Sequence, residues 1–188
     1  MTQTATHLMK TDVVAKADAF AERAHGLADQ RRKYTGEHYI EHPRAVAEHL
    51  RKLGFCDAVL AAALLHDVVE DTVVTIDEVR SEFGDGIAGW VAALTDVPSG
   101  QGLNRHERKR LNLSRLAEAD AEVHSIKLAD LINNTSSIVV HDTNWAPFYL
   151  REKKAAIAVL TRGHPRLIEE AKHAVESGFQ HLRRHHSH

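Results

Sequence analysis

The chain has 188 residues, a length that fits one domain with a substantial core. Its formal charge is −2 with the 15 histidines neutral, so no overall positive field indicates a nucleic-acid partner. The single cysteine, Cys56, excludes a disulfide framework and a cysteine-based zinc site, and it fits a reducing cytoplasm. No apolar run approaches the ~20 residues of a transmembrane helix, and the N-terminal residues lack the apolar core of a signal peptide. We therefore expect a cytoplasmic protein without a membrane partner, as a monomer or a homodimer.

Apolar residues at helical spacing predict helices from the start of the chain, and no segment alternates convincingly like a strand. The first helix covers residues 11–26. A polar connector follows, with a turn at Thr35-Gly36. The second helix, residues 42–54, has Pro43 in its first turn and Gly54 at a position suited to a C-terminal cap.

The next segment, residues 57–71, is apolar nearly all round and predicts a central helix that is covered on every side. Thr75 and Glu78 then form a capping-box pattern. Loop 97–104 contains proline and glycine and is a candidate for a mobile lid. Further helices are predicted at residues 75–84, 85–96, 104–119, 121–141, 145–161 and 164–182. The expected fold class is all-α, a single globular bundle of about eight to ten helices.

A cluster of ionisable residues follows the apolar part of segment 57–71. His66 and Asp67 end the apolar run, and Glu70 and Asp71 come after two valines. Burying such groups costs several kcal/mol each unless a partner compensates them, and a metal ion is one such partner. If the helix continues through them, all four side chains fall within an arc of roughly 140°. They would then line one wall of a cavity.

Two other positions offer ligands. His42 begins the preceding helix, and Asp130 lies among apolar neighbours on the helix predicted at 121–141. With His66 and Asp67 they would supply two imidazoles and two carboxylates, a set that suits Mn²⁺, with Zn²⁺ or Fe²⁺ as alternatives. The other interpretation is that His66 and Asp67 only cap a helix end.

Three short motifs, "YIEHP", "HDVVED" and "KLAD", together resemble the HD-domain phosphohydrolases. The acidic pair after His-Asp and the Tyr-Ile-x-His-Pro stretch are more selective, and they resemble the hydrolase domain of the RelA/SpoT family. The similarity runs from about His25 to Asn134. We expect a small alarmone hydrolase: one HD hydrolase domain over residues 1–188, with a motif core at about 25–140, C-terminal helices at 145–184 and a flexible tail at 185–188.

The resemblance implies an activity and a set of site residues. It implies hydrolysis of the 3′-pyrophosphate of (p)ppGpp-type alarmones, which releases pyrophosphate and GDP or GTP. The acidic pair, Glu70 and Asp71, would be catalytic, with the ion helping to activate water. The metal ligands would be His42, His66, Asp67 and Asp130.

The small-molecule nucleotide would be bound by a wider set of side chains. The family's pattern carries over onto Arg32, Lys33, Asn134 and Ser137. Lys127 shares the helix face of Asp130, and Tyr149 could cover the sugar or belong to the core. Family members often have basic residues where this chain has Leu131 and Ser136. A (p)ppApp hydrolase, an NADPH 2′-phosphatase or another HD-domain nucleotide phosphohydrolase is therefore an alternative, as is a regulatory nucleotide-binding module.

Overall fold

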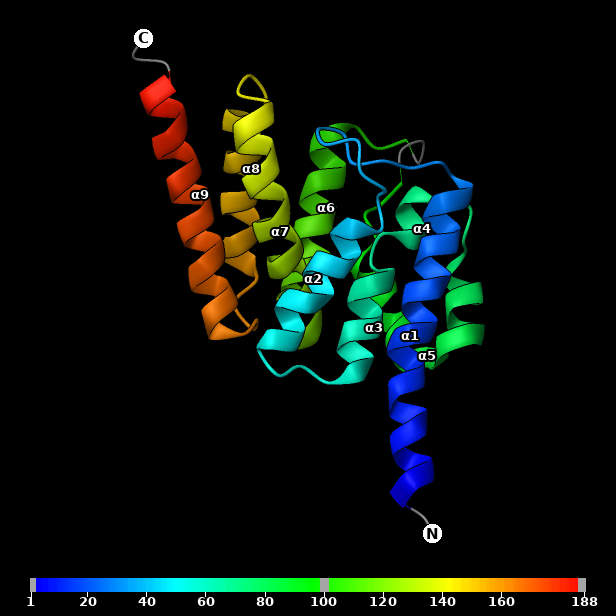
Figure 1. The fold of residues 1–188 in the computed structure, drawn as a ribbon. Coiled ribbons are helices and arrows are strands. Elements are labelled where there is room, and N and C mark those ends of the chain that lie inside the picture. The colour runs from blue at the N-terminus through cyan, green and yellow to red at the C-terminus, as the bar shows by residue number, and fades with distance from the viewer. Residues whose placement is uncertain (1–2, 99–101, 186–188) are drawn as a thin grey trace. The chain divides into compact units, whose positions relative to one another are not determined.

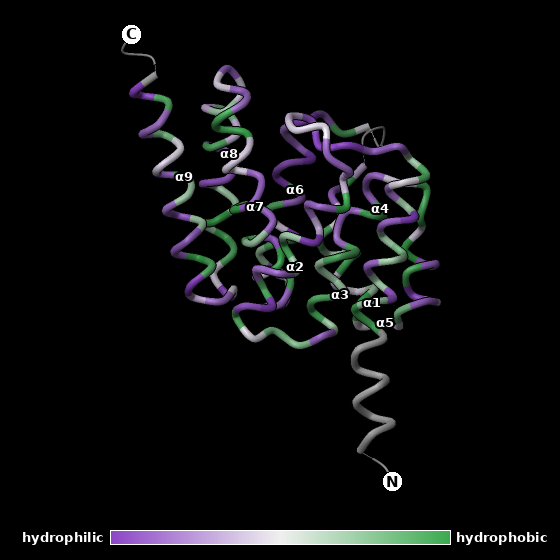
Figure 2. Tube along the Cα trace, in the orientation of Figure 1, coloured by the Kyte–Doolittle hydropathy of each residue, from purple (hydrophilic) through white to green (hydrophobic). Residues whose placement is uncertain are grey.

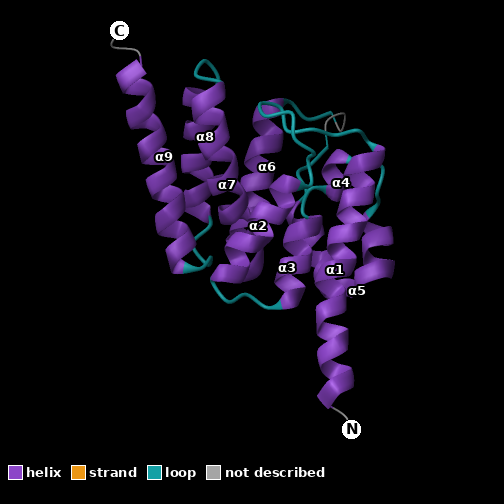
Figure 3. Cartoon of the chain, in the orientation of Figure 1, coloured by secondary structure: helices purple, strands orange, loops and turns teal. Residues whose placement is uncertain are grey.

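The computed structural model describes residues 3–98 and 102–185. The described residues form helices and no strand, and one isolated bridge pairs Arg31 with His38. The all-α prediction is therefore confirmed (Figures 1 and 3). Within this part of the chain no helix is both long and apolar enough to cross a bilayer.

Contacts between Cα atoms divide the chain into two compact units, Met1–Gly102 and Leu103–His188. The single HD domain over residues 1–188 stays a prediction. The proposed lid at 97–104 includes residues 99–101, which lie outside the described residues. Most of the predicted tail, residues 186–188, lies outside them as well.

The first unit is built around α3. Its helices are α1 (Gln3–Leu27), α2 (Glu41–Lys52), α3 (Asp57–Leu65), α4 (Val68–Asp71) and α5 (Ile76–Leu94). Helix α3 contacts α1, α2 and α5, and every side chain from Val59 to Leu65 is buried. Figure 2 shows the hydrophobic colouring along it. Because an all-round apolar helix must be covered on all sides, the predicted central helix is confirmed.

The predicted helix 57–71 differs from the structure in one respect: it is broken. Helix α3 ends at Leu65, and α4 begins at Val68, with Asp67 as its N-cap residue at φ −103° and ψ −5°. The ring nitrogen Nδ1 of His66 lies 2.7 Å from the carbonyl oxygen of Ala63. In a continuing helix the Ala63 carbonyl would accept from the Asp67 N–H, and the His66 ring competes with that N–H for the same oxygen. The assumption of a regular 100° step through His66 and Asp67 was therefore wrong.

Three of the predicted helix boundaries are confirmed by local hydrogen bonds and dihedral angles, whereas the first helix begins at Gln3 and not at residue 11. Gly54 follows α2 at φ 82°, a left-handed conformation that favours glycine. Thr75 caps α5: its side chain accepts from the Glu78 N–H, and the Glu78 carboxylate accepts from the Thr75 N–H at 2.7 Å. A kink at Gly84, with φ 83°, separates the two helices predicted on either side of it.

In the second unit α9 packs against both α7 and α8. The helices of this unit are α6 (Arg105–Glu118), α7 (Ala121–His141), α8 (Ala146–Val159) and α9 (Pro165–His185). The buried ring of His124 ties three segments together. Its Nε2–H donates to the Leu116 carbonyl at 2.6 Å, and its Nδ1 accepts from the Arg162 backbone N–H at 3.0 Å. This histidine fixes the turn after α8 against the end of α6.

Candidate metal centre

Three of the predicted ligands converge in the first unit. His42 lies in the first turn of α2, and His66 and Asp67 form the junction between α3 and α4. Their candidate ligand atoms all lie within 4.8 Å of one another. Asp67 Oδ2 is 3.0 Å from His66 Nε2 and 3.7 Å from His42 Nε2. Both imidazoles are 1% exposed, and the Asp67 carboxylate is half-buried.

Neighbouring groups orient two of these ligands. The Nδ1–H of His66 donates to the Ala63 carbonyl, which directs Nε2 and its lone pair toward Asp67. The hydroxyl of Tyr39 donates to Asp67 Oδ2 at 2.6 Å. Sequence reasoning assigned no role to Tyr39, although its place in the turn before α2, three residues before His42, was a usable signal.

The donor set is chemically suited to a divalent cation. Two imidazoles and one carboxylate are ligands for Mn²⁺, Fe²⁺ and Zn²⁺ alike, and the remaining positions would be open to further ligands or water. Among the described residues, these three form the one group of three or more metal-ligating side chains that lie close together. The structure thus brings three of the four predicted ligands together, which gives the chain a candidate metal site.

The acidic pair lies on α4, the short helix that follows Asp67. Both side chains are exposed. Glu70 Oε2 accepts from the Asp96 backbone N–H at 3.1 Å, and Asp71 Oδ2 accepts from Gln30 Nε2 at 2.8 Å. The two carboxylates are therefore held by different segments of the first unit, the end of α5 and the connector after α1.

Asp130 belongs to the second unit, where α7 buries it to 5% exposure. Lys127 Nζ lies 3.1 Å from its Oδ2, and Asn134 Nδ2 donates to its Oδ1 at 2.6 Å. These contacts confirm that the three residues share one face of the helix. Ser137 is half-buried farther along α7. Tyr149 is 7% exposed on α8, with Lys153 Nζ 5.0 Å from the centre of its ring.

The predicted basic pair lies in the connector between α1 and α2. Its turn is confirmed: the Gly36 N–H donates to the Arg32 carbonyl at 3.0 Å, and Gly36 has a φ of 73°. The Arg32 side chain is half-buried, and the Lys33 side chain is exposed. Lys33 Nζ donates to the Tyr34 hydroxyl at 3.2 Å. The roles of Arg32 and Lys33 in nucleotide binding stay predictions.

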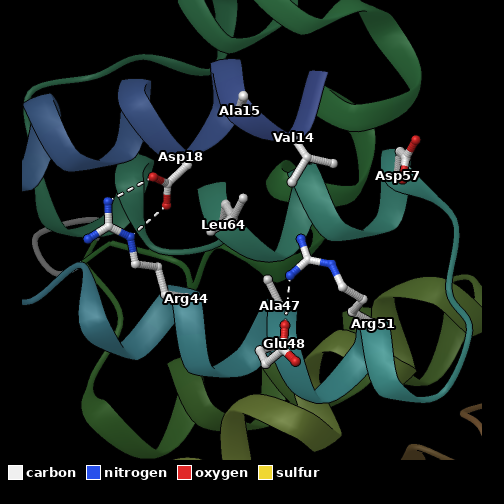
Figure 4. Close-up of a pocket in the computed structure, with 9 residues that line it drawn as sticks. All are labelled: Val14, Ala15, Asp18, Arg44, Ala47, Glu48, Arg51, Asp57 and Leu64. Carbon is white, nitrogen blue, oxygen red and sulfur yellow. Dashed lines mark hydrogen bonds and ion pairs between the residues drawn. The ribbon is translucent and has the colours of Figure 1, made fainter. Parts of the chain in front are cut away.

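A pocket of about 600 Å³ lies elsewhere in the first unit, lined by residues of α1, α2 and α3 (Figure 4). Its arginines are already paired. Arg44 donates twice to Asp18 at 2.7 Å, which raises the pKa of its guanidinium, and Arg51 donates to Glu48 at 2.7 Å. None of the predicted site residues lines this pocket.

Fold and site together define a class: an all-α protein whose helix ends bring two buried histidines and an aspartate together as a candidate metal centre. The chain belongs to the HD-domain family, whose model matches residues 17–156. That match includes every predicted ligand and both acidic residues.

Curated relatives and solved structures agree with this assignment. The human guanosine-3′,5′-bis(diphosphate) 3′-pyrophosphohydrolase MESH1 is 34% identical over 171 residues, which cover 89% of this chain and 90% of the relative. A probable enzyme of the same activity from Synechocystis is 39% identical over 129 residues. That alignment covers 67% of this chain but 17% of the relative, so the chain spans a small part of that protein. A solved metazoan SpoT orthologue, described as hydrolysing ppGpp, is 28% identical, with a TM-score of 0.78 and coverage of 88% and 94%.

Proposed function

We propose that this protein hydrolyses the 3′-pyrophosphate of (p)ppGpp-type alarmones and releases pyrophosphate with GDP or GTP. The observation that carries the proposal is the buried cluster of His42, His66 and Asp67 with the acidic pair on the following turn. Relatives of this chain are named for the same reaction, and one of them matches this chain over nearly its whole length. Metal-assisted hydrolysis needs side chains that bind the ion and a nearby base that accepts a proton from water.

We assign the metal to His42, His66 and Asp67, with Asp130 as the fourth ligand and Mn²⁺ as the ion. The proposal for Asp130 is supported by its burial and by the two contacts, from Lys127 and Asn134, that hold both of its oxygens. A buried carboxylate held in this way has a defined geometry in which to serve as a ligand. When bound, the ion would supply Lewis acidity toward a phosphoryl oxygen.

Glu70 and Asp71 are assigned to proton acceptance from the attacking water. Both are exposed, so both can reach a substrate, and both follow a metal ligand by one turn of chain. Each carboxylate accepts a hydrogen bond from a neutral N–H donor, that of Asp96 for Glu70 and that of Gln30 for Asp71, which helps to orient it. A positioned carboxylate of this kind contributes about 10²- to 10⁴-fold as a general base.

The side chains that we assign to nucleotide binding come from the sequence pattern, and each unit contains some of them. Arg32 and Lys33 supply positive charge in the first, and a guanidinium can also stack on a base. In the second, Lys127, Asn134, Ser137 and Tyr149 are the assigned side chains. We also propose that the protein is cytoplasmic and acts in a stringent-type response.

An adenine alarmone or NADPH remains a second candidate substrate because Leu131 and Ser136 replace the basic residues common in the family. The two positions differ in their exposure to solvent. Leu131 is 1% exposed and belongs to the core of the second unit, whereas Ser136 is exposed and donates to the Asn133 carbonyl at 2.8 Å.

The test is a product assay with the purified chain and Mn²⁺. The substrates are ppGpp, pppGpp, ppApp and NADPH, and the products are identified by chromatography. We expect pyrophosphate and GDP from ppGpp. Pyrophosphate from none of the alarmones would overturn the proposal, and phosphate from NADPH alone would replace it with the 2′-phosphatase. Glu70→Gln should lower kcat by about 10²- to 10⁴-fold, whereas the control Glu118→Gln, at an exposed position of α6, should not.

A further inference from the structure

A chain of three side chains connects the buried end of α1 with the acidic pair on α4. His25 Nδ1 lies 2.7 Å from Gln30 Oε1, and Gln30 Nε2 lies 2.8 Å from Asp71 Oδ2. We propose that His25 and Gln30 are positioning residues, which hold the Asp71 carboxylate in the orientation that its role as a proton acceptor requires. This inference rests on the proposed function, which assigns that role to Asp71.

The chemistry of the groups fixes the direction of the hydrogen bonds. An ionised carboxylate can only accept, so Gln30 must turn its amide nitrogen toward Asp71. Its carbonyl oxygen then faces His25, and the ring must donate through Nδ1–H. Burial lowers the pKa of His25, which favours the neutral ring, and the contact with the Gln30 oxygen places the ring proton on Nδ1. The three groups thus form one directed chain of donors and acceptors.

The series of hydrogen bonds is anchored at His25, its buried end. The His25 ring is 1% exposed, and its centre lies 4.8 Å from the centre of the Tyr39 ring. Backbone bonds fix the connector as well: the Gln30 N–H donates to the His25 carbonyl at 3.1 Å, and the Gln30 carbonyl accepts from the Tyr39 N–H at 3.2 Å. Tyr39 in turn holds the ligand Asp67. One connector therefore positions both a metal ligand and a catalytic carboxylate.

The Asp71 carboxylate would not keep one orientation without these hydrogen bonds. Asp71 is exposed, and it ends a four-residue helix that could not be stable alone. Its carboxylate would otherwise sample several rotamers, only some of which face a bound water. A group that selects the productive rotamer acts on the transition state, so its loss should lower kcat with little change in KM.

The kinetic test uses variants that keep the side-chain volume. Gln30→Met removes both hydrogen bonds, and we expect a loss in kcat of about 10- to 100-fold. The matched control is Gln180→Met at an exposed position of α9, which should keep its rate. His25→Leu should lower kcat as well, and His25→Asn should restore much of it because its amide can donate from nearly the same place. In an Asp71→Asn background, Gln30→Met should cost nothing more.

A spectroscopic test needs neither activity nor a variant. The ¹⁵N shifts of the His25 ring in the wild-type protein report which nitrogen carries the proton, and we expect Nδ1–H. A proton on Nε2 would overturn the chain of hydrogen bonds. An unchanged kcat in Gln30→Met, or a loss that adds fully to that of Asp71→Asn, would overturn the positioning role. If the wild type hydrolyses no alarmone, the proposed function fails. The ¹⁵N spectrum then still shows whether the hydrogen bonds from His25 through Gln30 to Asp71 are formed.

Discussion

The Tyr39 hydroxyl donates a 2.6 Å hydrogen bond to the same Asp67 oxygen that lies 3.0 Å from His66 Nε2. The phenol thus fixes the orientation of a carboxylate that would bind the metal. Tyr39→Phe removes only the hydroxyl, and we expect Mn²⁺ affinity to fall by about 10- to 100-fold, as for other groups that orient metal ligands. Isothermal titration calorimetry, with Mn²⁺ added to the metal-free protein, measures this affinity. Tyr34→Phe, in the same connector, is the control, and equal affinities of the two variants would contradict the role of Tyr39.

Metal binding should stabilise the folded protein, and the effect should depend on His66. A ligand that binds the folded state alone adds about 2.7 kcal/mol at a concentration of one hundred times its Kd. Mn²⁺ should therefore raise the Tm of the wild type and leave that of His66→Ala unchanged. His38→Ala, at an exposed connector position, should respond like the wild type. A chelator should reverse the increase.

Asp130, the fourth ligand of the proposed metal site, should contribute to Mn²⁺ affinity. If it binds the ion, Asp130→Asn should weaken Mn²⁺ binding by at least about 10-fold, because a charged ligand becomes neutral. Asp120→Asn changes an exposed aspartate of the same unit and should leave the affinity unchanged. Unaltered binding by Asp130→Asn would limit the site to the three residues of the first unit.

Gly163 is a position where an added methyl group should destabilise the second unit. A Cβ there would lie 2.5 Å from Leu128 Cδ1 and 3.4 Å from the backbone of His124. Because Leu128 is fully buried, its side chain has little room to yield, and Gly163→Ala should lower the free energy of unfolding by about 1 to 3 kcal/mol. Gly89→Ala on α5, where nothing lies within 4 Å, should be neutral or stabilising. Urea unfolding compares the two, and equal stabilities would argue against close packing at Gly163.

His25 should make the stability of the protein depend on pH. Burial lowers the pKa of its ring below the ordinary 6.5, despite the opposing effects of Gln30, Asp67 and Asp71. Below about pH 6.5 the unfolded chain therefore binds more protons at this position than the folded one. This contribution to stability is complete above that pH and is lost as the pH falls toward the folded-state pKa. Urea unfolding at about pH 7.5 and about pH 5.5 should show a smaller loss for His25→Asn than for the wild type. Equal losses would mean that the histidine is not buried in its neutral form.

The sequence by itself determined the helical class, several helix ends and which residues are candidate metal ligands. Helix periodicity, the cap at Gly54 and the capping box of Thr75 with Glu78 are local properties, set by neighbours within one or two turns. His66 and Asp67 could be recognised because ionisable groups after a buried helix need a partner.

Only the tertiary structure decided how the centre is assembled. The hydrogen bond between Tyr39 and Asp67 spans 28 positions of the chain, and the one between Gln30 and Asp71 spans 41. Such contacts depend on how α1 and α2 pack on α3, which no local pattern encodes. The break between α3 and α4 was missed for a related reason: there a side chain competes for a backbone carbonyl, against the helical preference of the residues around it.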